Sequence, residues 1–267
     1  MHMEIDGRAV SDDSLSAPAF LNYGHYTAMQ VDDRRVRGLV LHLARLDSAT
    51  RELFGTGLDA GHVRRLILHA LDGAGVRDAS TRVYVHWPDG NEAPTVTVTV
   101  GPPAEPSGEP RSLMSVPYQR PVPHIKHLGS FAQIHYSRAA VRAGFDDALL
   151  TGPGGVVTEG ASSNIGFWDG TSLVWPDSPA LAGTTMALLE PGLPSVRRRV
   201  TLDGLGAYRS AFVTNARGIA PVCRIDTTEF TVDEELTRRV SEVYASAPAE
   251  EIQEGLPRPL TAGARPC

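Results

Sequence analysis

Helical spacing of apolar residues dominates two stretches in the first third of the chain. Over residues 39–54 the apolar positions recur at intervals of three and four, which predicts an amphipathic helix that ends at Gly55. Asp59 is a suitable N-cap for a second helix, whose apolar positions continue to Gly73 or Gly75. We therefore expect two consecutive helices, each with one buried face.

Alternation of apolar and polar residues predicts strands around these helices. Residues 2–10 alternate weakly, and residues 26–31 form a short strand pattern that enters a hairpin turn. Residues 81–87 and 95–100 alternate more clearly and flank the turn sequence at 88–91, which indicates a β-hairpin. This part of the chain therefore has the pattern of an α+β layer.

The remainder of the chain has the pattern of short strands separated by glycine turns. Residues 101–110 are rich in Pro, Gly and Glu and have no periodicity, which indicates a surface loop near the connection between two domains. Helices are predicted over 130–143, 185–189 and 233–244, and strands over 147–150, 156–158, 164–168, 172–175 and 211–214. We expect an N-terminal domain over 1–117, a connecting loop over 118–124, a C-terminal domain over 125–250 and a flexible tail over 251–267.

Composition excludes several classes of protein. The chain has 267 residues, of which 42% are hydrophobic and 21% charged, as expected of a globular protein with two modest domains. The net charge of −6 is well mixed, so we expect a small-molecule partner rather than nucleic acid or an anionic membrane. No apolar run is long enough to span a membrane and the first residues lack a leader pattern, so we expect a cytoplasmic protein.

Cysteine and histidine spacing gives no sign of a metal site or a structural disulfide. The two cysteines, Cys223 and Cys267, do not form a CxxC pair. Histidines such as His124 and His127 lie close together but lack nearby third and fourth ligands. We therefore expect no bound metal.

One lysine stands out. Of the 25 Lys and Arg residues all but Lys126 are arginine. A guanidinium stays protonated, whereas a desolvated lysine can lose its proton and act as an amine nucleophile. The position that has kept lysine is therefore a candidate for amine chemistry, although an arginine-rich composition that spared one lysine by chance explains the count equally well.

Four ordered blocks surround this lysine and follow it along the chain. They are His124-Ile-Lys-His-Leu128, Ala143-Gly-Phe-Asp-Asp-Ala-Leu-Leu150, Val157-Thr-Glu-Gly-Ala-Ser-Ser-Asn-Ile165 and Leu181-Ala-Gly-Thr-Thr185. In order and spacing they resemble the core signature of the class IV aminotransferases, the fold type IV pyridoxal-phosphate enzymes. Upstream His42-Leu-Ala-Arg-Leu46 and downstream Thr214-Asn215 extend the resemblance over most of the chain.

The resemblance implies a two-domain fold of the D-amino-acid aminotransferase type. A smaller N-terminal α+β domain and a C-terminal domain of mixed, barrel-like β structure with helices would enclose pyridoxal 5′-phosphate between them. Family members generally complete their sites with a second subunit, so we expect a homodimer.

Two residues match the family positions that act on the cofactor ring. The resemblance implies that Lys126 holds the cofactor as a Schiff base and afterwards moves a proton as a free amine. Glu159 matches the carboxylate that keeps the pyridine nitrogen protonated, so that the ring can act as an electron sink. Its alternative role is that of a solvated loop glutamate.

The phosphate group requires a cradle of donors. Arg45 stands where the family places its phosphate arginine, whose forked donors suit a phosphate, and it is otherwise an ordinary exposed helix arginine. Thr185 would supply a hydroxyl at the start of a helix, with the N–H groups of Gly183 and Thr184 beside it.

Other matched residues have roles that the resemblance leaves open. Ser162, Ser163 and Asn164 lie in a turn that the family uses beside the cofactor, and these residue types also serve ordinary turns. On the substrate side we place Tyr26, Thr27 and Phe131. Tyr26 matches an active-site aromatic residue, and a core tyrosine of a strand is the alternative.

Several departures from the family pattern leave the reaction class open. Thr27 replaces the glutamate common in aminotransferases and matches the threonine usual in 4-amino-4-deoxychorismate lyases. The strand at 84–89 lacks the Arg-Gly element of many members, Met186 replaces an arginine and Gly129 an asparagine. Phe131 replaces a frequent tyrosine, which removes a hydroxyl.

Three functions follow from these observations. An aminotransferase, which would take an amino acid or amine as donor and a 2-oxo acid as acceptor, is the preferred interpretation. A lyase that releases pyruvate and 4-aminobenzoate is the alternative. A binding module without activity is disfavoured because it has no need of both Lys126 and Glu159.

Overall fold

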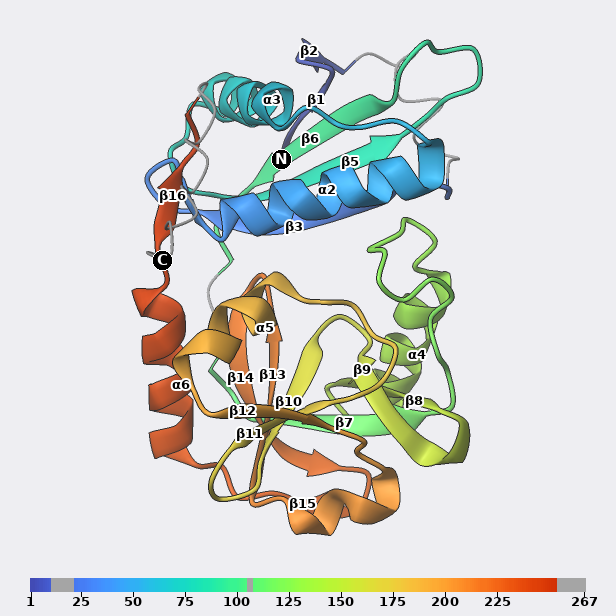
Figure 1. Ribbon diagram of the computed structural model, residues 1–267, viewed down its shortest axis with the longest axis vertical. Helices are drawn as coiled ribbons and strands as arrows, with labels where there is room; N and C mark the ends of the chain where they lie inside the picture. The colour runs from blue at the N-terminus through green and yellow to red at the C-terminus, as the bar shows by residue number, and fades with distance from the viewer. Residues whose placement is uncertain (11–21, 105–107, 254–267) are drawn as a thin grey trace, which may run out of the picture.

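The computed structural model describes residues 1–10, 22–104 and 108–253 and divides them into two layered units (Figure 1). The N-terminal unit contains a five-stranded antiparallel sheet in the order β2-β1-β6-β5-β3. Its strands are β1 (His2–Ile5), β2 (Arg8–Ala9), β3 (His25–Val31), β5 (Ala79–His86) and β6 (Thr95–Gly101). Alternate residues of β3 are buried, as expected for a strand with one face against a core.

Two helices pack on this sheet, as the apolar spacing predicts. They are α2 (Leu39–Phe54) and α3 (Ala60–Ala74), and their buried residues form one core cluster with those of the strands. Gly55 ends α2 in the left-handed conformation, and the Asp59 side chain accepts a hydrogen bond from the His62 N–H at the start of α3. The α+β prediction for this region is confirmed.

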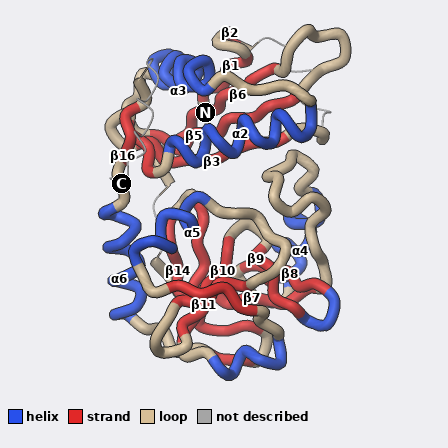
Figure 2. Tube along the Cα trace, in the orientation of Figure 1, coloured by secondary structure: helices blue, strands red, loops and turns tan. Residues whose placement is uncertain are grey.

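The C-terminal unit is built on a nine-stranded mixed sheet. Its path runs β12-β11-β10-β13-β14-β7-β8-β9, with β15 paired to β14. The strands are β7 (Arg111–Val116), β8 (Asp147–Gly152), β9 (Val156–Gly160), β10 (Asn164–Trp168), β11 (Leu173–Pro176), β12 (Ser195–Arg198), β13 (Ser210–Asn215), β14 (Gly218–Ile225) and β15 (Thr228–Glu229). The curled sheet and its helices are visible in Figure 2 and agree with the expected barrel-like domain.

Short helices join and cover these strands. The α-helices are α4 (Phe131–Arg142), α5 (Thr184–Leu189) and α6 (Glu234–Ser246), and the 3-10 turns are η1 (Pro153–Gly155), η2 (Glu190–Gly192) and η3 (Leu202–Ala207). The helix α6 packs against α5 and β14 and belongs to a core with Trp175 and Phe212. No helix in the described ranges is long and apolar enough to cross a membrane.

The boundary between the units lies earlier than the sequence indicates. β7 falls within the expected N-terminal domain, yet it pairs in parallel with β14 and β8 of the second sheet. Both partners come later in the chain, so the local pattern of residues 111–116 carries no information about which sheet they join. The connection therefore lies between β6 and β7, within residues 102–110.

The chain also returns to the N-terminal unit at its other end. β16 (Ala249–Glu251) pairs with β4 (Arg35–Arg37), and Ile252 is buried in the N-terminal core. The start of the expected flexible tail at residue 251 is therefore an ordered strand, whereas residues 254–267 lie outside the described residues. A short strand that pairs only with distant residues has no recognisable pattern of its own.

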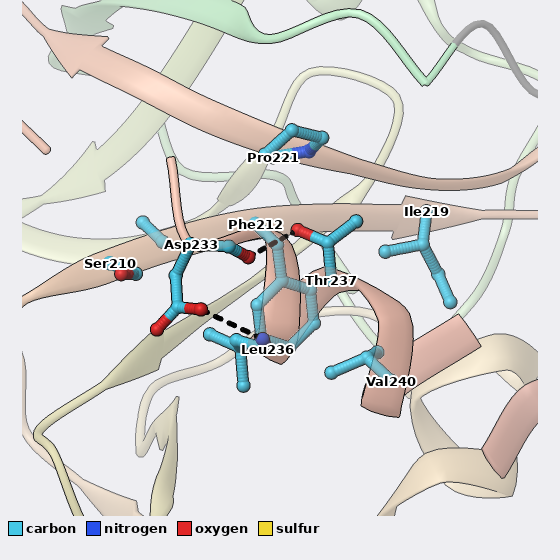
Figure 3. A pocket seen from close by; sticks show the side chains of 9 residues that line it. Ser210, Phe212, Ile219, Pro221, Asp233, Leu236, Thr237 and Val240 are labelled. Carbon is cyan, nitrogen blue, oxygen red and sulfur yellow. Dashed lines mark hydrogen bonds between the residues drawn. The ribbon is translucent and has the colours of Figure 1, made fainter. Parts of the chain in front are cut away.

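A small cavity lies between α6 and the strands β13 and β14 (Figure 3). Its lining is mainly apolar and includes Phe212, Leu236 and Val240. Its volume of about 10 Å³ is room for about one water molecule beside the buried Ser210 hydroxyl, which has no hydrogen-bond partner among the described residues. This cavity is a gap in the packing of the core and is too small for a substrate.

Candidate active site

The segment that carries Lys126 is attached to the edge of the N-terminal sheet. The Tyr26 N–H donates to the Lys126 carbonyl, and the Leu128 N–H donates to the Gly24 carbonyl, both at 2.9 Å. An antiparallel bridge joins His25 to His127 between these two bonds. Residues 126–128 thus extend the sheet beyond β3 and fix the lysine at the boundary of the two units.

The side chain of Lys126 lies over an aromatic ring. Its Nζ is 4.8 Å from the centroid of the Tyr26 ring, and Tyr26 stacks on Tyr84 of β5 at 5.5 Å. The structure therefore brings Tyr26 to the lysine, as the sequence predicts for a residue on the substrate side. Tyr84 was not identified from the sequence, because the pairing that places it opposite Tyr26 joins strands far apart in the chain.

The surroundings of Lys126 favour the neutral amine. Burial lowers the pKa of Lys126 to about 8, and the charges of Arg45 and Arg120 act in the same direction. The carboxylate of Glu159 opposes them. A lysine in this state loses its proton far more readily than one on the surface, which is what an amine nucleophile requires.

Glu159 is a buried carboxylate with two donors. The Arg120 guanidinium forms an ion pair with its Oε1 at 3.2 Å, and the Leu181 N–H donates to Oε2 at 3.3 Å. Burial raises the pKa of Glu159 despite the charge of Arg120. Arg120 also donates to the Ile125 carbonyl at 2.6 Å, so it connects the glutamate to the segment before the lysine.

Arg45 crosses from one unit to the other. It lies on α2, and its Nη2 donates to the Ala182 carbonyl at 2.7 Å and to the Thr184 hydroxyl at 2.9 Å. Burial lowers the pKa of Arg45 to about 10, and the charge of Arg120 contributes. The guanidinium stays charged at neutral pH and lies beside the first residues of α5, as the sequence predicts.

Gly183 is the N-cap of α5 and has no room for a side chain. A Cβ at this position would come within 1.8 Å of the Asn164 Oδ1. Asn164 in turn donates from Nδ2 to the Leu181 carbonyl at 2.7 Å. The close contact brings the Asn164 turn and the start of α5 together, and the buried Thr185 hydroxyl is engaged with the Asn215 carbonyl at 2.9 Å.

The two serines make contacts typical of a turn. The Ser162 side chain is exposed and donates to Asp147 Oδ2 at 3.2 Å. The Ser163 carbonyl accepts a hydrogen bond from the Gly160 N–H at 2.8 Å. The structure places both beside Asn164, and a direct contact of either serine with a cofactor stays a prediction.

Thr27 lies away from the substrate side on which it was expected, whereas a substrate contact of the exposed Phe131 stays a prediction. Thr27 is fully buried, and its hydroxyl lies 2.6 Å from His42 Nδ1 on the face of the sheet covered by α2. Successive residues of a strand face opposite sides, so Thr27 cannot share the side of Tyr26. Phe131 is 80% exposed and stacks on His135, so no pocket encloses it.

Sequence reasoning missed Arg120 and His42 as parts of the site. Burial lowers the pKa of His42 to about 3, with contributions from the charges of Arg45 and Lys126, so the imidazole is neutral. His42 belongs to the block that contains Arg45, which was a usable signal. Arg120 had none, because its pairing with Glu159 depends on the fold. Within the described ranges no group of His, Cys, Asp and Glu side chains could hold a metal ion.

The comparisons with known proteins agree with this geometry. Residues 24–225 match the family model of class IV aminotransferases, so the chain belongs to that family. It is 22% identical over 227 residues to a branched-chain-amino-acid aminotransferase from Pseudomonas aeruginosa, with 80% of this chain and 73% of that protein covered.

Solved structures share the whole fold. A hypothetical aminotransferase from Mycobacterium tuberculosis in its PLP-bound form has a TM-score of 0.79 at 19% identity, covering 92% of this chain and 98% of that one. A proposed 4-amino-4-deoxychorismate lyase from Legionella pneumophila has a TM-score of 0.76 at 19% identity, covering 86% and 93%. The predicted family and fold are therefore confirmed.

The residues present fit pyridoxal 5′-phosphate, the cofactor of this family. An amine with a lowered pKa, a buried carboxylate and a charged guanidinium are the three groups that its aldehyde, ring nitrogen and phosphate require. Gly183, the N-cap of α5, makes no side-chain cap hydrogen bond, so no side chain of the cap residue occupies the N–H groups that follow it. The site thus has one suitable side chain for each of the three polar groups of the cofactor.

Proposed function

We propose that this protein transfers amino groups between an amino acid and a 2-oxo acid, with pyridoxal 5′-phosphate held by Lys126. The observation that carries the proposal is the state of Lys126: its amine lies over the Tyr26 ring, and burial lowers its pKa to about 8 although the Glu159 carboxylate opposes the shift. When bound, the cofactor supplies an electron sink for a substrate carbanion.

Each residue of the site has a role in this scheme. Lys126 would hold the cofactor through its Nζ, whose lowered pKa makes the neutral amine accessible, and the same amine would take up and return a substrate proton as a general base. Glu159, held by Arg120, keeps a proton on the ring nitrogen. Arg45 and the N–H groups of Gly183 and Thr184 bind the phosphate. These roles remain proposals.

Arg82 supports a substrate that carries a carboxylate. It lies on the same strand face as Tyr84, is exposed, and has no ion pair or hydrogen bond within the described ranges. Burial raises the pKa of Tyr26 and lowers that of Lys126, and the charge of Arg82 opposes the first shift and adds to the second, so Arg82 lies near the amine. An unpaired guanidinium beside the lysine favours an amino acid over a plain amine.

The fate of the cofactor tests the proposed reaction. Enzyme loaded with cofactor is mixed with single amino acids and amines without an acceptor, and absorption spectra are recorded. We expect at least one amino acid to convert the visible band to that of the amino form, and pyruvate or 2-oxoglutarate to restore it. Arg82→Gln should weaken the response to amino acids and leave the response to plain amines unchanged.

The lyase is retained as the second candidate because of Thr27. Its hydroxyl forms a buried hydrogen bond with His42, a neutral imidazole near Lys126, and aminotransferases commonly have glutamate at this position. If no amine changes the spectrum while aminodeoxychorismate yields 4-aminobenzoate with the visible band retained, transfer is wrong and the lyase replaces it.

We also propose that the active form is a homodimer. The exposed side of α4 carries Phe131, Ile134 and Val141, which are 80%, 50% and 58% exposed. Such apolar side chains on one helix are typical of a surface that a partner covers. Sedimentation should give twice the mass of the chain, and an active monomer at assay concentration would exclude this proposal.

A further inference from the structure

The chain beyond α6 forms a strap from the C-terminal unit back to the N-terminal unit (Figure 1). We define this C-terminal strap as residues 249–252. Its strand β16 pairs antiparallel with β4 in the register Ala249↔Arg37, Glu250↔Val36 and Glu251↔Arg35. The Ile252 N–H donates to the Arg34 carbonyl at 3.0 Å, and its side chain is 2% exposed. The strap is therefore firmly anchored in the N-terminal core.

The strap also supplies a cap for α2. The N-cap residue of this helix is Gly38, which has no side chain to accept a hydrogen bond from the free N–H groups of the first turn. The carboxylate of Glu250 accepts the Val40 N–H at 3.2 Å instead. A negative charge at a helix N-terminus is favourable, so Glu250 holds the first turn of α2 in place.

That first turn lies directly against the phosphate end of the site. A Cβ on Gly38 would come within 3.1 Å of the Thr184 side chain and 3.3 Å of Leu188, so α2 begins in close contact with α5. Arg45 lies about two turns further along the same helix. Its guanidinium reaches the Ala182 carbonyl and the Thr184 hydroxyl. The position of Arg45 therefore depends on how the start of α2 sits on α5.

A second contact ties the strap region to α6. The Arg37 guanidinium lies over the Tyr244 ring, 5.7 Å from its centroid, and Arg35 donates to the Ala249 carbonyl at 2.5 Å. β4, which runs directly into Gly38, is thus held from both sides. These contacts link the end of the chain to the start of the helix that carries Arg45.

We propose that Glu250 is a positioning residue for the phosphate of the cofactor, acting through the first turn of α2 and through Arg45. The inference rests on the proposed function, because it takes the phosphate as the ligand of Arg45. Glu250 touches neither the cofactor nor Lys126; it sets the distance between the guanidinium and the N–H groups of α5.

The test is a double-mutant cycle on cofactor binding. Dissociation constants of pyridoxal 5′-phosphate are measured by absorbance for the wild type, Glu250→Ala, Arg45→Ala and the double variant. Glu250→Ala should weaken binding by about threefold to tenfold, in line with the loss of a helix cap. In the Arg45→Ala background the same change should have no further effect, because the group that it positions is gone.

Glu251→Ala is the matched control, since Glu251 is in the same strand but its carboxylate accepts a hydrogen bond from Gln253 and from no other side chain in the part of the chain that the structure describes. It should bind the cofactor like the wild type. If Glu250→Ala folds poorly, Glu250→Gln keeps the size of the side chain, removes the charge and should show a smaller loss of the same kind.

The outcomes separate the two proposals. An unchanged dissociation constant for Glu250→Ala, or an equal loss in both Arg45 backgrounds, would overturn the positioning role and leave the proposed function standing. A wild-type protein that binds no pyridoxal 5′-phosphate would instead overturn the proposed function itself.

Discussion

At the scale of single residues, the main feature of the site is the lowered pKa of Lys126, which makes its amine easier to deprotonate. Burial and the charges of three arginines lower the pKa of Lys126, and only Glu159 opposes them. Arg45 and Arg120 are engaged with partners from the C-terminal unit, which fixes their charges near the amine. The lysine is therefore held in a setting that favours its reaction at a cost in stability.

We predict that Lys126→Met makes the cofactor-free protein more stable. The pKa of Lys126 is depressed from 10.5 to about 8, so the folded state at pH 7 contains a charged amine that burial disfavours. Replacing it with an apolar side chain of similar length should raise the free energy of unfolding by about 0.5–2 kcal/mol. Urea denaturation at pH 7 measures this.

The stability gain of Lys126→Met should shrink as the pH rises from 8 towards 10.5. In this range the amine of the folded wild type is neutral while that of the unfolded chain still binds a proton, so the wild type becomes more stable with rising pH. Borohydride should reduce the bond between Lys126 and the cofactor and make it permanent in the wild type. In Lys126→Met no such covalent adduct should form. A variant that is less stable than the wild type at pH 7 would contradict the account of the lysine.

Sequence reasoning was most successful for residues within the ordered blocks. Lys126, Glu159, Arg45 and Gly183 lie together as expected, because each block has its own pattern. It failed for Thr27, although strand alternation alone would have placed Thr27 opposite Tyr26. Arg120 could not be found, because nothing local marks the partner of a glutamate 39 residues away.

At the scale of elements, a buried glutamate joins the first strand to α3. Glu4 is 4% exposed and accepts hydrogen bonds from His2 at 2.9 Å and from His69 at 2.7 Å. Hydrogen bonding to Glu4 raises the pKa of His69, and the two histidines lower the pKa of Glu4 despite its burial. Glu4 and His69 therefore form a pH-dependent link between the first strand and α3.

We predict that His69→Gln destabilises the protein at pH 5.5 and has little effect at pH 8.5. Because the pKa of His69 is raised in the folded state, protonated His69 contributes fully to the free energy of unfolding below pH 6.5. This contribution is lost as the pH rises through the pKa of His69 in the folded state. Because the pKa of Glu4 is lowered in the folded state, its carboxylate still stabilises the protein just below pH 4.5. This stabilisation is lost when the pH falls through the pKa of Glu4 in the folded state. Denaturation curves at both pH values test this.

His62→Gln is the control for this experiment, because only the backbone N–H of His62 takes part in a described hydrogen bond. It should cause the same small change at both pH values. An effect of His69→Gln that is equal at pH 5.5 and 8.5 would exclude the ionic part of the link.

The start of α5 gives a third prediction. In Gly183→Ala the new methyl group would meet Asn164 at 1.8 Å, so Asn164 has to give up its bond to the Leu181 carbonyl. We expect a loss of about 1–3 kcal/mol in stability and of at least about tenfold in cofactor affinity, since the proposed phosphate donors would move with the turn.

Gly206→Ala is the matched substitution, because a Cβ there meets nothing within 4 Å. It should leave both stability and cofactor affinity close to those of the wild type. Normal cofactor binding by Gly183→Ala would mean that the tight turn plays no part in holding the phosphate.

At the scale of the whole molecule, the site belongs to neither unit alone. Arg45 comes from the N-terminal unit, Glu159 and Thr184 from the C-terminal unit, and Lys126 from a segment that follows β7 but pairs with β3. A site between two domains was expected from the family resemblance, but the pairing of the Lys126 segment with β3 and the return of β16 were not, because both depend on pairing between residues far apart in the chain.

We therefore predict that the cofactor stabilises both units together. A ligand at 100 times its dissociation constant adds about 2.7 kcal/mol to the free energy of unfolding. Differential scanning calorimetry should show one transition that moves to higher temperature with cofactor concentration. Two transitions, of which only one moves, would indicate that a single unit holds the cofactor.

The composition of the chain has a practical consequence at the active site. Lys126 is the one lysine in the sequence and lies half-buried over Tyr26. Amine-reactive dyes, cross-linkers and resins therefore find, apart from the chain terminus, a single target. A cofactor held on Lys126, as proposed, would protect that target, so the protein could be coupled through its amino terminus with the Lys126 amine untouched.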